Sequence, residues 1–156
     1  MIICKADKKH IDIIEKITIS TIKQVYPKYY PEGAVDFFIN HHNTENIMKD
    51  ILSGCVYILI NDNSKTVGTV TINVNEINRL FVLPEYQGMG FGSALLNFSE
   101  NLIFESHQKI IISASLPAKQ IYLRRGYTEI SYNTIKTTNG DYLCYDEMKK
   151  IKNKEN

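Results

Sequence analysis

The sequence predicts a single α/β domain (α+β in some schemes) in which helices flank both faces of a mixed β-sheet. The chain has 156 residues, of which 44% are hydrophobic, so it can bury the core of one domain. Apolar residues recur along it at helical spacing in some segments and at strand spacing in others. A hairpin-forming half precedes a strand–helix–strand half, and this combination brings antiparallel and parallel pairs into one sheet.

The first third of the chain is predicted to be mainly helical. Residues 1–5 form a short strand, and Asp7 is suited to cap the helix that follows. Isoleucines recur at helical spacing over residues 8–25. The next segment, Tyr-Pro-Lys-Tyr-Tyr-Pro, must end that helix, because proline disfavours helix in the residue before it. Two shorter helices are expected over residues 33–41 and 43–54.

The remaining two thirds are predicted to form strands with two helices between them. Asn-Asp-Asn-Ser at 61–64 and Thr-Asn-Gly at 138–140 are typical hairpin turns. Residues 109–115 are almost wholly apolar, as expected of a strand buried on both faces. We expect strands over 56–60, 66–74, 76–83, 109–115, 128–136 and 142–149, helices over 93–106 and 117–126, one domain over 1–149 and a charged tail over 150–156.

Composition and charge limit the class of protein. The formal net charge of +1 does not suggest a polyanionic partner. No apolar run approaches the ~20 residues that span a bilayer, and charges stand where a signal peptide needs its apolar segment. Three widely spaced cysteines fit neither a disulfide framework nor a zinc site. We therefore expect a cytoplasmic protein with no metal, no nucleic-acid partner and no membrane partner.

The most informative segment is a glycine-rich turn between an apolar strand and an amphipathic helix. Gly88, Gly90 and Gly92 stand at alternate positions, and backbone without Cβ atoms can aim several N–H groups at one anion. The N-terminus of the helix adds unpaired N–H groups and a partial positive charge. The dinucleotide fingerprint is excluded because it needs glycine where Ser93 stands, and no P-loop run exists. The segment predicts a phosphate or pyrophosphate site of another kind.

The pattern that remains is Q-x-x-G-x-G, at Gln87, Gly90 and Gly92. It resembles the coenzyme A pyrophosphate loop of the GNAT superfamily of N-acetyltransferases, and the alternative is a glycine-rich turn without a ligand. The resemblance implies acetyl-CoA as co-substrate, and it implies that the strand before the loop splays from the next strand to admit the pantetheine arm. The implied cofactor-binding residues are Leu80, Phe81, Val82, Gln87, Gly88, Met89, Gly90, Phe91, Gly92, Ser93 and Ser115.

A second segment resembles the superfamily pattern N-x-x-A-x-x-x-Y-x-x-x-G-F. Ala118, Tyr122 and Gly126 match it, while Tyr127 replaces Phe and Ser115 replaces Asn. The tyrosine of this pattern faces the coenzyme sulfur, which implies that Tyr122 protonates the departing thiolate. A phenol with a pKa of ~10 is neutral at pH 7 and can donate that proton. The alternative is that Tyr122 is a packed aromatic residue on an amphipathic helix.

The general base has several candidates. Glu76 lies at the start of the strand that leads into the loop. The chain resembles some GNAT members here, in which a glutamate at the equivalent position acts as the base. The alternative is a solvated carboxylate at the end of a strand. His41 and His42 are the other candidates, because an imidazole titrates near neutrality. The oxyanion donor implied by the resemblance is the backbone N–H of Phe81 or Val82.

The acceptor side is expected to include one charged and several aromatic residues. Arg79 is the odd charge in an apolar strand, and it either reaches the acceptor or lies on the sheet surface. An aromatic cluster follows the first long helix and consists of Tyr26, Tyr29, Tyr30, Phe37 and Phe38. It forms either a wall around the acceptor amine or a core contact, with Phe37 and Phe38 expected to be mostly core and the tyrosines partly accessible. The expected acceptor-binding residues are Tyr26, Tyr30, His42 and Arg79.

Together these features predict transfer of an acetyl group from acetyl-CoA directly to a primary amine, in a ternary complex and without an acyl-enzyme. The alternative is a non-catalytic acyl-CoA-binding sensor or scaffold. Tyr122 favours the enzyme, because a binder needs no proton donor at the sulfur. A nucleotide switch would need a lysine and magnesium ligands that the sequence lacks. We expect a small-molecule or peptide amine as acceptor, and a monomer or homodimer.

Overall fold

The computed structural model describes residues 1–153 and contains one seven-stranded sheet, in the order β1-β2-β3-β4-β5-β7-β6. Neighbouring strands are antiparallel except for β4 and β5, which are parallel, so the predicted mixed sheet is confirmed. The strands are β1 (Ile2–Lys5), β2 (Val56–Ile60), β3 (Thr66–Asn73), β4 (Glu76–Val82), β5 (Lys109–Ser115), β6 (Thr128–Lys136) and β7 (Tyr142–Ile151).

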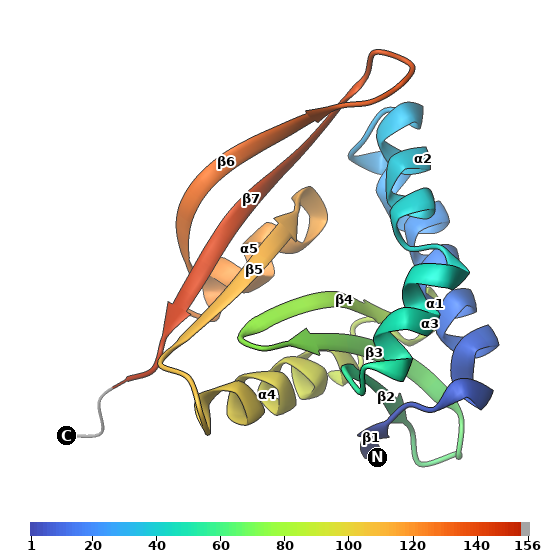
Figure 1. Ribbon diagram of the computed structural model, residues 1–156, viewed down its shortest axis with the longest axis vertical. Coiled ribbons are helices and arrows are strands. Elements are labelled where there is room, and N and C mark those ends of the chain that lie inside the picture. The colour runs from blue at the N-terminus through green and yellow to red at the C-terminus, as the bar shows by residue number, and fades with distance from the viewer. Residues whose placement is uncertain (154–156) are drawn as a thin grey trace.

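Helices cover both faces of this sheet, as predicted (Figure 1). Side chains of the first three helices pack on one face, and those of the last two pack on the other. Phe81 and Val82, which are neighbours on β4, belong to apolar clusters on opposite faces, as strand alternation requires. The helices are α1 (Ile11–Val25), α2 (Glu32–His41), α3 (Thr44–Leu52), α4 (Phe91–Phe104) and α5 (Leu116–Arg124), with 3-10 turns η1 (Lys8–His10), η2 (Tyr26–Lys28) and η3 (Pro84–Tyr86).

The centre of the sheet is open because β4 and β5 pair only where they begin. Their register joins Glu76 to Ile111 and Ile77 to Ile112, and it contains no further pair. Beyond these residues the two strands diverge, as Figure 1 shows. The splay implied by the family resemblance is therefore present, and it lies directly before the glycine-rich loop.

A bulge in β4 contributes to this divergence. The register between β3 and β4 shifts at Thr69 and Thr71, and Arg79 on the opposite strand has a φ of +45°. A bulge bends its strand and increases the local twist. A left-handed backbone is uncommon for a residue with a side chain, and such residues cluster at functional sites.

Most predicted boundaries differ from the observed ones by one or two residues. Asp7 does act as an N-cap, accepting a hydrogen bond from the Lys9 N–H, but the first turn is 3-10 and α1 begins at Ile11. The helix after the loop begins at Phe91, earlier than expected, because Gly90 takes the left-handed conformation at its N-cap. β7 runs to Ile151, beyond the expected end of the domain at 149. Residues 154–156 of the expected tail lie outside the described part of the chain.

No helix in residues 1–153 has the length and apolar character needed to cross a membrane.

Candidate active site

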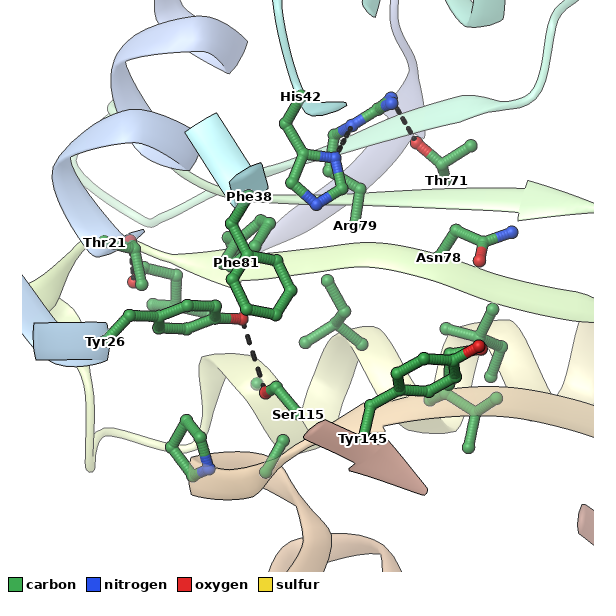
Figure 2. Close-up of a pocket in the computed structure, with 18 of the residues that line it drawn as sticks. Thr21, Tyr26, Phe38, His42, Thr71, Asn78, Arg79, Phe81, Ser115 and Tyr145 are labelled. Atoms are coloured by element: carbon green, nitrogen blue, oxygen red, sulfur yellow. Dashed lines mark hydrogen bonds between the residues drawn. The ribbon is translucent and has the colours of Figure 1, made fainter. Parts of the chain in front are cut away.

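One cleft of about 1290 Å³ follows the opening between β4 and β5. One group of lining residues comes from the glycine-rich loop, β4, the end of β5 and α5. The other group comes from α1, η2, α2, α3, β3 and β7. Figure 2 shows residues of both groups facing the same space. The cleft is therefore continuous from the glycine-rich loop to the N-terminal helices.

The glycine-rich loop has the backbone that an anion site needs. Gly88 and Gly90 have φ values of +76° and +87°, and a Cβ added at either would meet no atom within 4 Å. The space over the loop is open, and α4 begins immediately after Gly90 with its unpaired N–H groups. Gln87 fixes the start of the loop, because its Nε2 donates to the Val82 carbonyl over 3.0 Å.

Not every predicted loop residue faces the cleft. Gln87, Gly88, Gly90, Gly92 and Ser93 line it. Met89 and Phe91 do not, since Met89 is 63% exposed and the Phe91 ring lies 6.2 Å from the Tyr86 ring.

The edge of β4 supplies backbone groups to the opening. Leu80, Phe81 and Val82 all line the cleft. The Leu83 N–H donates to the Val67 carbonyl on β3 over 2.9 Å. Because successive backbone groups of a strand point to opposite edges, the N–H and C=O of Val82 face the gap toward β5. Of the two expected oxyanion donors, Val82 is the one with this orientation.

Tyr122 lies in the wall of the cleft, on α5. Pro117 stands in the first turn of that helix, where its missing N–H costs nothing. Tyr122 is 7% exposed, and burial raises the pKa of its phenol above the ordinary value. The side chain is therefore a neutral phenol at physiological pH. Ser115 is at the N-cap position of α5, and its hydroxyl accepts from the Tyr26 hydroxyl over 3.3 Å.

The expectation that the tyrosines of the aromatic cluster are accessible was right for Tyr29, which is 51% exposed and lines the cleft, and wrong for Tyr26 and Tyr30. Tyr26 and Tyr30 are 7% and 6% exposed, whereas Phe37 and Phe38 are half-buried and line the cleft. Tyr26 and Tyr30 can be buried because the hydroxyl of each has a hydrogen-bond partner. The Tyr30 hydroxyl donates to the Cys144 carbonyl over 2.9 Å and accepts from the Leu116 N–H over 2.8 Å.

These contacts separate the two tyrosines that were expected to bind the acceptor. Tyr26 lines the cleft and meets the end of β5 through Ser115. Tyr30 does not line it. Its hydroxyl instead ties the turn between η2 and α2 to β7 and to the start of α5, so the structure places Tyr30 behind the wall as a packing residue.

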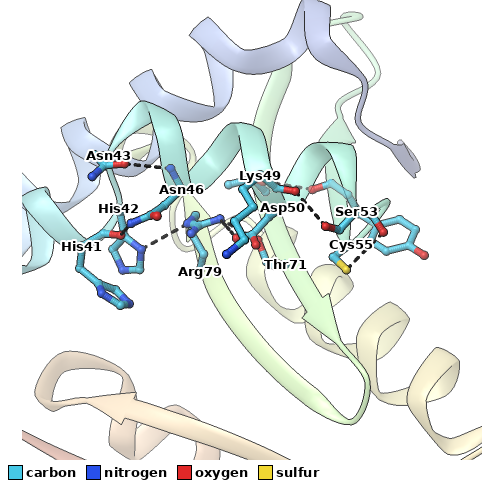
Figure 3. Close-up of polar contacts among 12 residues, drawn as sticks. His41, His42, Asn43, Asn46, Lys49, Asp50, Ser53, Cys55, Thr71 and Arg79 are labelled. Carbon is cyan, nitrogen blue, oxygen red and sulfur yellow. Dashed lines mark hydrogen bonds and ion pairs between the residues drawn. The ribbon is translucent and has the colours of Figure 1, made fainter.

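Arg79 lies in the wall of the cleft, and its guanidinium is occupied by three neighbours. Its Nη1 donates to Asp50 Oδ2 over 2.7 Å and to Thr71 Oγ1 over 3.2 Å. Its Nε donates to His42 Nδ1 over 3.2 Å. The side chain is 6% exposed, so of the two alternatives for Arg79, exposure on the sheet surface is excluded. Figure 3 shows how Arg79 joins α3 to the residue that follows α2.

The candidate bases lie in different places. His42 lines the cleft, but burial, followed by the nearby charge of Arg79, lowers its pKa to about 3. His41 lines the cleft and is exposed, with its ring stacked on Phe37 at 5.9 Å. Glu76 is exposed at the closed end of the β4–β5 opening and is not among the lining residues.

Sequence reasoning missed several residues that line the cleft. Asn78 on β4 and Tyr145 on β7 face the cleft from opposite sides (Figure 2). Asp50 and Lys49 on α3 line it as well. Their only sequence signal is polarity within otherwise ordinary elements, because the pairing of β7 with β5 is what brings Tyr145 to the site.

Comparison with known proteins agrees with this geometry. The family profile described as "Acetyltransferase (GNAT) domain" matches residues 25–151. No curated protein matches the chain by sequence.

Solved structures share the fold over nearly the whole chain. A GCN5-related N-acetyltransferase from Rhodopseudomonas palustris is 23% identical with a TM-score of 0.86, covering 97% of this chain and 95% of that one. The YncA putative acetyltransferase from Salmonella typhimurium, solved with its cofactor acetyl-CoA, is 16% identical with a TM-score of 0.72, covering 100% and 96%. PaiA N-acetyltransferase from Thermoplasma acidophilum, in complex with coenzyme A, is 16% identical with a TM-score of 0.71, covering 97% and 98%. The family match, the splayed sheet and the loop geometry agree, and the chain belongs to the GNAT family of N-acetyltransferases.

Proposed function

We propose that this enzyme transfers an acetyl group from acetyl-CoA directly to a primary amine within a ternary complex. The observation that carries the proposal is the continuity of the cleft. The phosphate-binding loop, the free edge of β4, Tyr122 and the acceptor wall all open into one space. An amine bound among α1, α2 and α3 can therefore approach a thioester bound along β4.

The chain's own residues divide the binding of acetyl-CoA among three segments. The backbone N–H groups of residues 88–93, together with the start of α4, hold the pyrophosphate. The edge of β4 at Leu80, Phe81 and Val82 pairs with the amides of the pantetheine arm. The Val82 N–H, which faces the gap, stabilises the negative charge that develops on the thioester oxygen.

The transfer then needs one bond to form and one to break. The neutral amine nitrogen attacks the thioester carbon, a C–N bond forms, and the C–S bond breaks as the tetrahedral intermediate collapses. Tyr122 donates its phenolic proton to the departing sulfur, and water restores that proton. Its buried position suits this step, because a raised pKa keeps the phenol protonated until the thiolate leaves.

The proton released by the amine leaves through water. His42 is a poor base in this setting, since its Nδ1 already accepts from Arg79. We propose that Glu76 at the end of β4, or the exposed imidazole of His41, takes the proton by way of solvent. Neither has to enter the cleft for that role.

Initial-rate kinetics test the proposal. CoA release should be measured against both substrates over a panel of primary amines, with the N-acetyl product identified by mass spectrometry. Intersecting double-reciprocal lines and an N-acetylated product are expected. Parallel lines would indicate an acyl-enzyme and contradict direct transfer. Tight acetyl-CoA binding without CoA release, over the whole panel, would indicate a sensor or scaffold instead.

A further inference from the structure

Arg79 determines which ring nitrogen of His42 carries the proton. An arginine Nε–H can only donate, so the His42 Nδ1 that lies 3.2 Å away must act as an acceptor. In the neutral imidazole the single proton is then on Nε2. The hydrogen bond from Arg79 therefore sets the tautomer of His42. Burial, followed by the adjacent guanidinium charge, lowers the pKa of the imidazole and keeps the ring neutral.

The Nε2–H of His42 faces the cleft. Figure 2 shows that ring nitrogen directed away from Arg79 and into the space above Tyr145 and Ser115. No hydrogen bond among the described residues uses it. The ring itself is held in place, since it packs edge-on against Phe81 at 5.7 Å and against His41 at 5.0 Å. The cleft thus presents a rigid, neutral hydrogen-bond donor.

The charges of the cleft exclude one class of acceptor. Among the described lining residues, Asp50 is the only carboxylate, and Lys49 and Arg79 are the cations. The Asp50 carboxylate is already bound by Arg79 at 2.7 Å. A polyamine carries several ammonium groups and would find only this one carboxylate, already paired with Arg79, while Lys49, which forms no ion pair among the described residues, would repel it.

The same wall is suited to an apolar group. Phe37, Phe38, Phe81 and Tyr26 all line the cleft, and the Tyr26 and Phe38 rings meet edge-to-face at 4.7 Å. A site lined by aromatic side chains with a few fixed polar groups favours a small ligand that has both characters.

We propose that the acceptor is a monoamine that carries an apolar group and a carbonyl or carboxylate oxygen, and this proposal rests on the proposed function. The His42 Nε2–H binds that oxygen and determines specificity, and Arg79 is the residue that positions His42. An amine without the oxygen leaves this donor unpaired once the ligand has displaced water from the half-buried ring, and such a loss discriminates between substrates.

Calorimetric titration of the CoA-saturated protein tests this directly, because it measures acceptor binding without requiring transfer. The three matched probes share a phenylalkyl amine. L-Phenylalaninamide carries an amide carbonyl, L-phenylalanine carries a carboxylate, and 2-phenylethylamine carries neither. Spermidine is the polyamine probe. We expect at least tenfold tighter binding of one of the two oxygen-bearing amines than of 2-phenylethylamine, and no saturable binding of spermidine. Equal affinity for 2-phenylethylamine, a preference for spermidine, or failure of both oxygen-bearing amines to bind would overturn the proposal.

Two substitutions separate the donor from the packing of the ring. His42→Phe keeps an aromatic ring and removes the donor, so the preference should fall to within threefold. His42→Gln can place an amide N–H near the position of Nε2, so it should retain most of the preference. Thermal unfolding and CoA affinity report whether each variant is folded. An unchanged preference in folded His42→Phe would contradict the role of His42.

Parallel assays of CoA release distinguish failure of this proposal from failure of the proposed function. Rapid acetylation of 2-phenylethylamine or spermidine by the wild type would support acetyl transfer and overturn the acceptor class. The expected binding preference without any CoA release would support the acceptor class and contradict transfer. In the variants, KM for the oxygen-bearing amine should rise while kcat changes less.

Discussion

The two ends of the cleft are built in different ways. The coenzyme end comes mainly from the continuous segment of β4, loop and α4, to which the end of β5 and α5 are added. The acceptor end is assembled from α1, α2, α3, β3, β4 and β7, which are far apart in the sequence. The coenzyme end depends on backbone geometry, whereas the acceptor end depends on side chains that hydrogen-bond to one another. A local motif can therefore report the first, while only the fold creates the second.

The difference is clearest in what holds each end in place. At the coenzyme end the glycines provide open backbone, and the Val82 carbonyl, which accepts from Gln87 Nε2 and from Thr21 Oγ1, fixes the entry to the loop. At the acceptor end the buried Arg79 joins Asp50, His42 and Thr71. Substitutions at the coenzyme end should therefore alter binding or chemistry, and substitutions at Arg79 should also alter stability.

The largest expected effect is on the chemical step. Tyr122→Phe removes one hydroxyl and keeps the ring, and general acid catalysis contributes ~10²–10⁴-fold, so kcat at saturating acetyl-CoA should fall within that range. KM for acetyl-CoA should change far less. Because burial raises the pKa of Tyr122, its protonated form persists with rising pH, so the wild-type rate should show no loss of this acid below pH ~10.

Steady-state CoA release measures this effect, with Tyr127→Phe as the control. Tyr127 is a buried tyrosine beside Tyr122, with ring centroids 5.5 Å apart, but it does not line the cleft. Its variant should keep wild-type kcat. Full activity in Tyr122→Phe would make Tyr122 a packing residue and leave water as the proton source.

The next effect is on stability, at the acceptor end. Arg79→Met keeps much of the side-chain volume and leaves the Asp50 carboxylate without its partner. The Asp50 side chain is 32% exposed, so solvent offsets part of the loss, and the free energy of unfolding in urea should fall by roughly 1–3 kcal/mol, between the costs for exposed and buried pairs. Arg124→Met is the control, because Arg124 is exposed on α5 and should change stability by less than about 0.5 kcal/mol. Equal stability in the two variants would show that the Arg79 network does not hold α3 in place.

A smaller effect concerns cofactor binding at the loop. Gly90→Val adds a branched side chain where φ is +87° and where the space over the backbone is open to a ligand. Acetyl-CoA affinity should fall more than tenfold, or ~1.4 kcal/mol, by calorimetry. Gly140→Val introduces the same strain at a φ of +90° in the turn between β6 and β7, away from the cleft. If both variants are folded and bind acetyl-CoA as the wild type does, the phosphate-loop assignment is wrong.

The smallest effect is expected at Glu76. Because this carboxylate lies outside the cleft, Glu76→Gln should lower kcat less than tenfold while flattening the acidic limb of the pH–rate profile. Acetyl-CoA affinity should stay the same. Glu105→Gln, at an exposed carboxylate that follows α4, is the control. A wild-type profile in Glu76→Gln would leave His41 or bulk water as the proton acceptor.

The extent of sequence prediction follows the same division. The order of strands and helices was predictable because each has a clear apolar period and clear turn residues, and the loop was predictable because its glycines all lie in one short segment of the sequence. The bonds of Tyr30 to Cys144 and Leu116 were not, since they join residues that are distant in the chain. The partners of Arg79 were also hidden, because the bulge in β4 and the packing of α3 are both tertiary features.

A crystal structure of the complex with coenzyme A tests the central claim most directly. The account predicts the pyrophosphate over the N–H groups of residues 88–93, the pantetheine arm along the β4 edge, and the sulfur within hydrogen-bond reach of the Tyr122 hydroxyl. Coenzyme A bound away from the opening between β4 and β5, or with its sulfur remote from Tyr122, would contradict it.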